Sequence, residues 1–126
     1  MLPKHKKDKL LSYGQKVIEI ECVNLQYLRE KLGESFADAV ELLYLCKGKV
    51  IVTGIGKSGI IGRKIAATLA STGTPSIFMH PGEAVHGDLG MVARNDIVIV
   101  ISNSGQTEEI IRILPSIKKI GARIIS

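Results

Sequence analysis

Ser102 to Glu109 form the stretch of this chain richest in side chains that could bind an anion. It follows an all-apolar run, residues 97–100, and precedes an amphipathic run, residues 110–120, which predicts a strand, a tight loop and a helix. A helix N-terminus has unpaired N–H groups and a partial positive charge, so it suits an anion. The loop adds uncharged donors to those N–H groups, and such a dense set favours a phosphate monoester. These donors are Ser102, Asn103, Ser104 and Thr107.

The same residues also fit an ordinary helix start. Ser104 or Thr107 would then cap the helix, and Glu108 and Glu109 would only complement the helix dipole. Gly105 lets the backbone turn under either hypothesis, because it has no Cβ to clash. Strand-to-helix turns often have this composition, so the loop alone leaves the two interpretations open.

A second loop, from Gly54 to Gly59, also follows a strand-like run and precedes a helix-like one. Together with Gly56, its end residues fit the G-x-G-x-x-G pattern of dinucleotide-binding loops. That pattern expects an acidic residue about 20 residues further on, at the end of the second strand, where this chain has His80. The loop does not match a P-loop either, since Ile51 stands where that pattern requires glycine.

Helix-like and strand-like patterns alternate along the chain, after two N-terminal helices at residues 9–32 and 34–46. Strands are predicted at 50–53, 76–80, 97–101 and from 122, with helices at 60–71 and 110–120 and a long loop at 81–92. We therefore expect an α/β fold, a flavodoxin/Rossmann-like three-layer sandwich with a parallel sheet. Ligands bind such sheets at the carboxyl ends of the strands, where both glycine-rich loops and the His86 loop would lie.

Three side chains expected at that edge could carry out acid–base chemistry. With a phosphate held by the Ser102 loop and by Ser58, Lys57 could stabilise an oxygen that gains negative charge. Glu109 and His86 could move protons. Aldose–ketose isomerisation of a phosphosugar needs this set and requires no metal or redox cofactor. The simpler alternatives are a solvated lysine at the helix start and a histidine that caps a turn with Asp88.

Composition narrows the partners and the compartment. The 126 residues carry a net charge of +5, with 4% aromatic residues and no Trp, which argues against base stacking on nucleic acid. Five lysines lie in the first sixteen residues, where a solvated helix start is favoured over a nucleic-acid contact. Cys22 and Cys46 fit buried free thiols in a reducing compartment. No signal peptide or membrane span is recognisable, so we expect a cytoplasmic protein.

Three segments together resemble the sugar isomerase (SIS) domain of D-arabinose 5-phosphate isomerases. They are Gly54–Gly59, His80–Met91 and Ile101–Glu109, and the resemblance runs from about Leu10 to the last residue. It implies interconversion of D-ribulose 5-phosphate and D-arabinose 5-phosphate through an enediol, for 3-deoxy-octulosonate synthesis in lipopolysaccharide or capsule. It also implies a homotetramer with a phosphorylated pentose as substrate.

Residue by residue, the resemblance implies two groups of functional positions. The family's catalytic positions correspond to Lys57, His86 and Glu109. Its phosphate-binding loops correspond to Ser58, Ser102, Ser104 and Thr107. Gln106 is a departure, because relatives often carry Glu there.

Similar proteins continue further, with a second catalytic histidine and often paired CBS regulatory domains. We therefore expect residues 1–126 to be a phosphosugar-binding SIS domain that ends mid-domain. A non-catalytic phosphosugar sensor is the alternative function, and a dinucleotide-binding oxidoreductase is the third hypothesis.

Overall fold

The computed structural model describes all 126 residues and divides them into two units, Met1–Asp38 and Ala39–Ser126. The first unit contains α1 (Lys4–Lys31), and α2 (Glu34–Tyr44) begins in the first unit and ends in the second. The two predicted N-terminal helices are therefore confirmed. No helix of the structure combines the length and the apolar character needed to cross a membrane.

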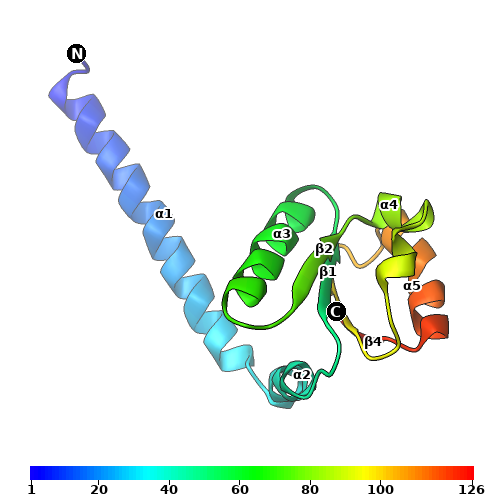
Figure 1. Ribbon diagram of the computed structural model, residues 1–126. Helices are drawn as coiled ribbons and strands as arrows, with labels where there is room; N and C mark the ends of the chain where they lie inside the picture. Colours follow the sequence, from blue (N-terminus) through cyan, green and yellow to red (C-terminus); the bar gives the residue numbers. More distant parts are fainter. The chain divides into compact units, whose positions relative to one another are not determined.

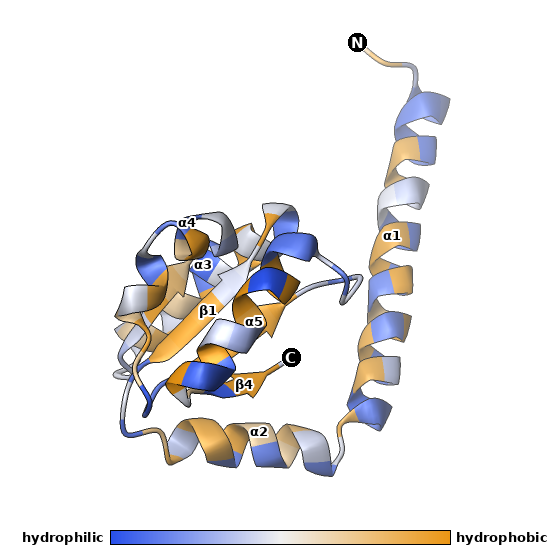
Figure 2. Ribbon diagram, turned by 90° about the vertical axis from the view of Figure 1, so that its right-hand side faces the viewer, coloured by the Kyte–Doolittle hydropathy of each residue, from blue (hydrophilic) through white to orange (hydrophobic).

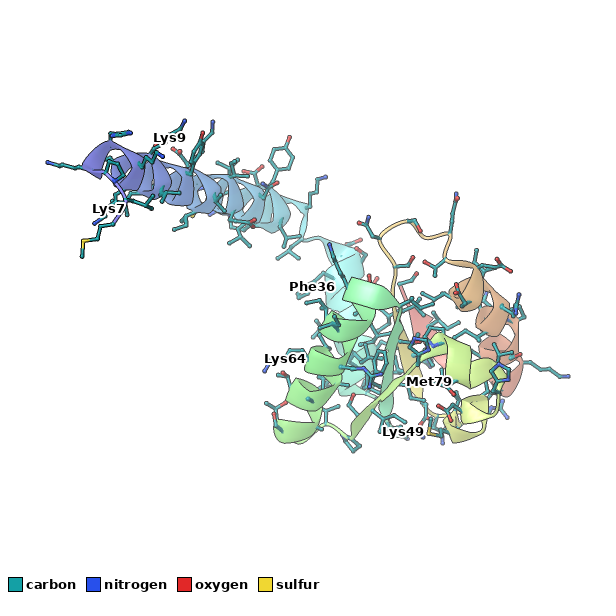
Figure 3. The ribbon with its side chains drawn as sticks, turned by 90° about the horizontal axis from the view of Figure 1, so that it is seen from above. Lys7, Lys9, Phe36, Lys49, Lys64 and Met79 are labelled. Atoms are coloured by element: carbon teal, nitrogen blue, oxygen red, sulfur yellow. The ribbon has the colours of Figure 1, made fainter.

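α1 buries none of its residues, and Figure 3 shows its side chains projecting from all around the helix. It starts at Lys4, earlier than the apolar spacing predicted, because its basic first turn has good helix propensity without apolar periodicity. The prediction that both cysteines are buried is wrong for Cys22, which lies on α1 and is exposed, while Cys46 is half-buried and both are free thiols.

Four parallel strands form one sheet in the order β2-β1-β3-β4. They are β1 (Val50–Gly54), β2 (Ser76–Met79), β3 (Ile97–Ile101) and β4 (Arg123–Ile125). The β-branched runs that predicted buried strands are indeed strands, and every residue of β1 is buried. The predicted parallel α/β fold is therefore confirmed.

Helices cover both faces of this sheet, as the three-layer prediction required. α3 (Gly56–Ser71) lies on one face, while α4 (Pro81–Val85) and α5 (Glu108–Ile120) lie on the other, as Figure 1 shows. Alternate β1 side chains enter two different cores: Val50 and Val52 pack with Ala66 of α3, and Ile51 packs with residues of α4 and α5. In Figure 2 the strands are hydrophobic, whereas α5 carries both hydrophobic and hydrophilic residues.

The predicted long loop at residues 81–92 is wrong, because it contains two short helical segments. Pro81 begins α4 and His80 caps it, since the His80 Nδ1 accepts a hydrogen bond from the Gly82 N–H at 3.1 Å. A 3₁₀ helix, η1 (Asp88–Met91), follows. These segments are too short to show an apolar period. α3 also starts at Gly56, four residues earlier than predicted, so the first glycine-rich loop is short.

Asp96 ties together the chain segments that enter the two central strands. Only 2% of it is exposed, and its carboxylate accepts from the Lys49 N–H at 3.0 Å, the Lys49 Nζ at 2.7 Å and the Ala93 N–H at 2.8 Å. Burial alone would raise the pKa of this carboxyl, but these hydrogen bonds and the Lys49 charge hold it below its usual value. The carboxylate is therefore stabilised in its ionised form in the folded protein.

Asp96→Asn should destabilise the fold by about 2–3 kcal/mol, since it removes a charge-assisted pair and leaves the Ala93 N–H facing an amide. Because the folded pKa is depressed, the contribution of Asp96 is complete above its higher unfolded pKa. It is lost as pH falls through the lower folded value. Urea unfolding at pH 7 and at pH 3 measures both effects. The exposed Asp38→Asn is the control, and an equal loss of stability in the two variants at pH 7 would contradict this role for Asp96.

Candidate functional site

The sheet reverses its winding direction between β1 and β3. From β1 the chain crosses through α3 to β2 on one side, and from β3 it crosses through α5 to β4 on the other. Such a switch point leaves a crevice at the carboxyl ends of the two strands, where open α/β sheets bind ligands. Gly54 pairs with Ile101 at these ends. The two loops singled out in the sequence therefore leave the sheet from directly paired residues.

Close packing explains the glycine spacing of the first loop. A Cβ on Gly59 would lie 2.7 Å from the Gly54 carbonyl oxygen, and a Cβ on Gly54 would lie 3.0 Å from the Ile101 carbonyl oxygen. Gly56 has φ +58°, a left-handed conformation that favours glycine. These glycines let β1 turn directly into α3. The N-cap of α3, Ile55, makes no side-chain hydrogen bond, so the helix start lacks an internal acceptor there.

Hydroxyl groups order the second loop from within. The Ser102 Oγ lies 3.0 Å from the Thr107 Oγ1, the Gly105 N–H donates to Ser102 Oγ at 3.1 Å, and the Gln106 N–H donates to Ser104 Oγ at 3.2 Å. Gly105 has φ +66° and forms the tight turn. Asn103 and Ser104 are exposed at the tip of this loop.

The alternative in which Ser104 or Thr107 only caps the helix is half right. Thr107 does occupy the N-cap position of α5, but its side chain makes no capping hydrogen bond, because its hydroxyl faces Ser102. The first-turn N–H groups of α5 therefore lack a capping side chain, as those of α3 do. Two uncapped helix starts at neighbouring strand ends form a site with anion-binding character.

Lys57 and Glu109 hold equivalent positions, each the second residue of its helix, α3 or α5, and both are exposed. The neighbouring Glu108 differs, because it accepts a hydrogen bond from Arg112 at 2.9 Å, one turn further along α5. The structure thus separates two adjacent carboxylates that the sequence left equivalent. Glu109 is the one that is not engaged in an ion pair.

His86 lies at the C-cap of α4 and is exposed. Its helix packs into the same core as α5, through Ala84 and Ile110, so His86 lies on the α5 face of the sheet. The side-chain hydrogen bond of this segment is made by His80 and not by His86 with Asp88, so the predicted turn cap is absent. Ser58, in the first turn of α3, is half-buried.

Two polar residues at this edge were not proposed as site residues from the sequence. His80 is half-buried at the end of β2, with its ring fixed by the bond to Gly82. Thr53, next to Gly54, is fully buried and its Oγ1 has no hydrogen-bond partner. The H-P-G sequence after a strand was an available signal for His80, whereas Thr53 looks like any β-branched strand residue. No group of three or more His, Cys, Asp or Glu side chains is placed to hold a metal ion.

Comparison with known proteins identifies the family. The family model described as SIS domain matches residues 42–126. The chain belongs to the SIS domain family. The resemblance found in the three sequence segments is therefore confirmed.

Individual relatives agree with this assignment. The chain is 53% identical over 113 residues, 90% of its length, to Arabinose 5-phosphate isomerase KdsD of Pseudomonas aeruginosa, and covers 35% of that protein. An Escherichia coli structure in complex with arabinose 5-phosphate is 48% identical with a TM-score of 0.86, covering 99% of this chain and 65% of that one. A structure from Listeria monocytogenes, assigned as a sugar-phosphate isomerase, is 30% identical with a TM-score of 0.88. The match covers 98% of this chain and 64% of that one. The chain spans about a third of the length of the curated relatives it matches.

Proposed function

We propose that this SIS chain takes part in the interconversion of D-ribulose 5-phosphate and D-arabinose 5-phosphate. The observation that carries the proposal is the 53% identity to Arabinose 5-phosphate isomerase KdsD across 90% of the chain. The pairing of Gly54 with Ile101 supports it, because it brings a lysine-bearing and a glutamate-bearing helix start to one crevice. The product would feed 3-deoxy-octulosonate synthesis for lipopolysaccharide or capsule.

The phosphate of the sugar would bind first, at the two uncapped helix starts. Backbone N–H groups of α3 and α5 would donate to its oxygens, and the dipoles of both helices favour its charge. Hydroxyl and amide groups would complete the set, with Ser58 from α3 and Ser102, Asn103, Ser104 and Thr107 from the second loop. This anchor would hold the reacting carbons at a fixed distance from α5.

Proton transfer would then use the groups flanking the anchor. Glu109 would remove the proton from the carbon next to the carbonyl, since Glu108 is already paired with Arg112. Lys57 would stabilise the oxygen of the enediolate that forms, and His86 would move a proton between the two oxygens. Return of the proton to the neighbouring carbon completes the isomerisation. The ketose and the aldose have the same overall oxidation level, so the reaction needs no redox cofactor, and the transferred proton can exchange with solvent while Glu109 holds it.

Conversion of D-ribulose 5-phosphate into D-arabinose 5-phosphate by the purified chain is the direct test. One-dimensional NMR of the mixture should show the aldose anomeric signals grow to a constant ratio, and solvent deuterium should enter the carbon that exchanges. Saturable binding of the sugar phosphate without either signal would support a phosphosugar sensor instead. Stabilisation by NAD with no effect of sugar phosphates would favour an oxidoreductase.

We also propose that α1 packs against further copies of the chain in a homotetramer. The support is its surface: α1 buries nothing by itself and exposes Leu11, Ile18 and Leu25 at helical spacing. Ile18→Asp together with Leu25→Asp should reduce the assembly to a smaller species in light scattering coupled to gel filtration. Glu19→Gln, on the same helix, is the control. An unchanged mass for the double variant would contradict this role for α1.

A further inference from the structure

A cavity lies at the amino ends of the strands, on the opposite edge of the sheet from the candidate site. Its volume is about 370 Å³, which falls at the small end of the range for ligand pockets, roughly 300–1,000 Å³. Segments that enter three strands form its walls: the end of α2 with Lys47 before β1, Arg94 before β3 and Arg123 at the start of β4. Nothing in the proposed isomerase chemistry uses these residues.

Positive charge gathers around this cavity without a matching acid. Lys47, Arg94 and Arg123 line it and are exposed, and none of them takes part in either of the two salt bridges of the structure. The acid on the wall is Asp96, whose carboxylate is already used by Lys49 and by the Ala93 N–H. Because the Lys49 ammonium balances that carboxylate, the remaining charge of the wall is positive.

One of the cations, Arg94, has its aliphatic stem beside the end of α5. Gly121 ends α5 with φ +91°, and the Arg94 stem lies so close that a Cβ on Gly121 would be 3.2 Å from its Cγ. The Arg94 stem therefore lies beside a glycine that the helix end requires in any case. Guanidinium groups bind phosphate through two parallel N–H bonds, which a lysine cannot do.

One part of the cavity wall is apolar. It is formed by Leu42 of α2, by Leu45 just after that helix and by the half-buried Cys46. A ligand that fills the cavity would place a charged group between the two arginines and an apolar or ring-shaped portion against these side chains. This arrangement differs from the proposed phosphate anchor of the candidate site, which consists of uncharged hydroxyls and backbone N–H groups.

We propose that this cavity binds a small organic phosphate that carries a ring or apolar portion, at a site separate from the phosphosugar crevice. Adenosine monophosphate and inorganic phosphate are the probes, and amide NMR shifts locate each of them. Adenosine monophosphate should bind more tightly than phosphate and shift the amides of Asn95, Gly121 and Arg123. Leu45→Ala should narrow the difference in affinity between the two probes.

Charge-matched variants decide whether the cavity is responsible. Arg94→Ala with Arg123→Ala should weaken adenosine monophosphate roughly tenfold or more, since two charge-assisted contacts are lost. Lys64→Ala with Lys119→Ala removes the same charge from exposed positions that do not line the cavity and should leave the affinity unchanged. Equal weakening in both double variants, or shifts confined to the amides of Gly56 and Gly105, would overturn the proposal.

Discussion

Glu109→Gln should lower kcat for D-ribulose 5-phosphate by about 10²–10⁴-fold, the usual contribution of a positioned acid–base group. Glutamine preserves the size of the side chain but cannot take a proton from carbon. The proposed phosphate anchor lies in the loop before α5 and in α3, so KM and sugar-phosphate binding should change little. Steady-state kinetics and a thermal shift with the sugar phosphate measure the two effects separately.

Glu108→Gln is the matched control for this prediction. The two carboxylates are neighbours on α5, but Glu108 is held by Arg112 at 2.9 Å and is exposed. Losing this exposed i,i+4 pair should cost little stability and leave kcat within about twofold. A larger loss of kcat in Glu108→Gln than in Glu109→Gln would reverse the assignment. Equal activity of both variants and the unmodified chain would remove Glu109 from the mechanism.

Gly59→Ala should destabilise the protein by about 2–3 kcal/mol, as an overpacked core position does. The added Cβ would lie 2.7 Å from the Gly54 carbonyl oxygen, and a backbone atom cannot move aside as the end of a side chain can. The start of α3 must then shift away from β1. Sugar-phosphate binding should weaken as well, because that shift separates the two helix starts. Urea unfolding and isothermal titration measure the two losses.

Gly90→Ala provides the contrast. Gly90 is exposed in η1, and nothing lies within 4 Å of its Cβ position. The same substitution there should change stability by no more than about 0.5 kcal/mol. If Gly59→Ala were as well tolerated as Gly90→Ala, the close approach of α3 to β1 would not be a constraint on the site.

The sequence was most informative where one element carries its own pattern. β-branched runs such as Val50–Val52 identified the strands, and Gly121 identified the end of α5, because these signals depend on local backbone preference. The order of the strands was not predictable, since nothing local says on which side of β1 the third strand pairs. That pairing, Gly54 with Ile101, is what makes two separate loops into one candidate site.

The candidate site residues also divide into those with a local sequence signal and those whose role depends on distant partners. The loop glycines and hydroxyls could be proposed as site residues from the sequence alone, while the difference between Glu108 and Glu109 required knowledge of their partners. A signal did exist, since Arg112 stands four residues after Glu108 on a helix. Asp96 gave no such signal, because an Asn-Asp pair before a strand looks like a turn. Its role depends on Lys49, which is distant in sequence.

The pairing of Gly54 with Ile101 also governs when a binding site can exist during folding. Strands β1 and β2 are neighbours in sequence and in the sheet, so this part can form early, whereas β3 joins the other edge of β1 through a contact between distant residues. Contacts between distant residues form slowly, because the chain loses loop-closure entropy before the strands gain the energy of pairing. A ligand that touches both loops binds only after this step. It should therefore act as a clamp across the sheet, raising the midpoint of unfolding with the logarithm of its concentration.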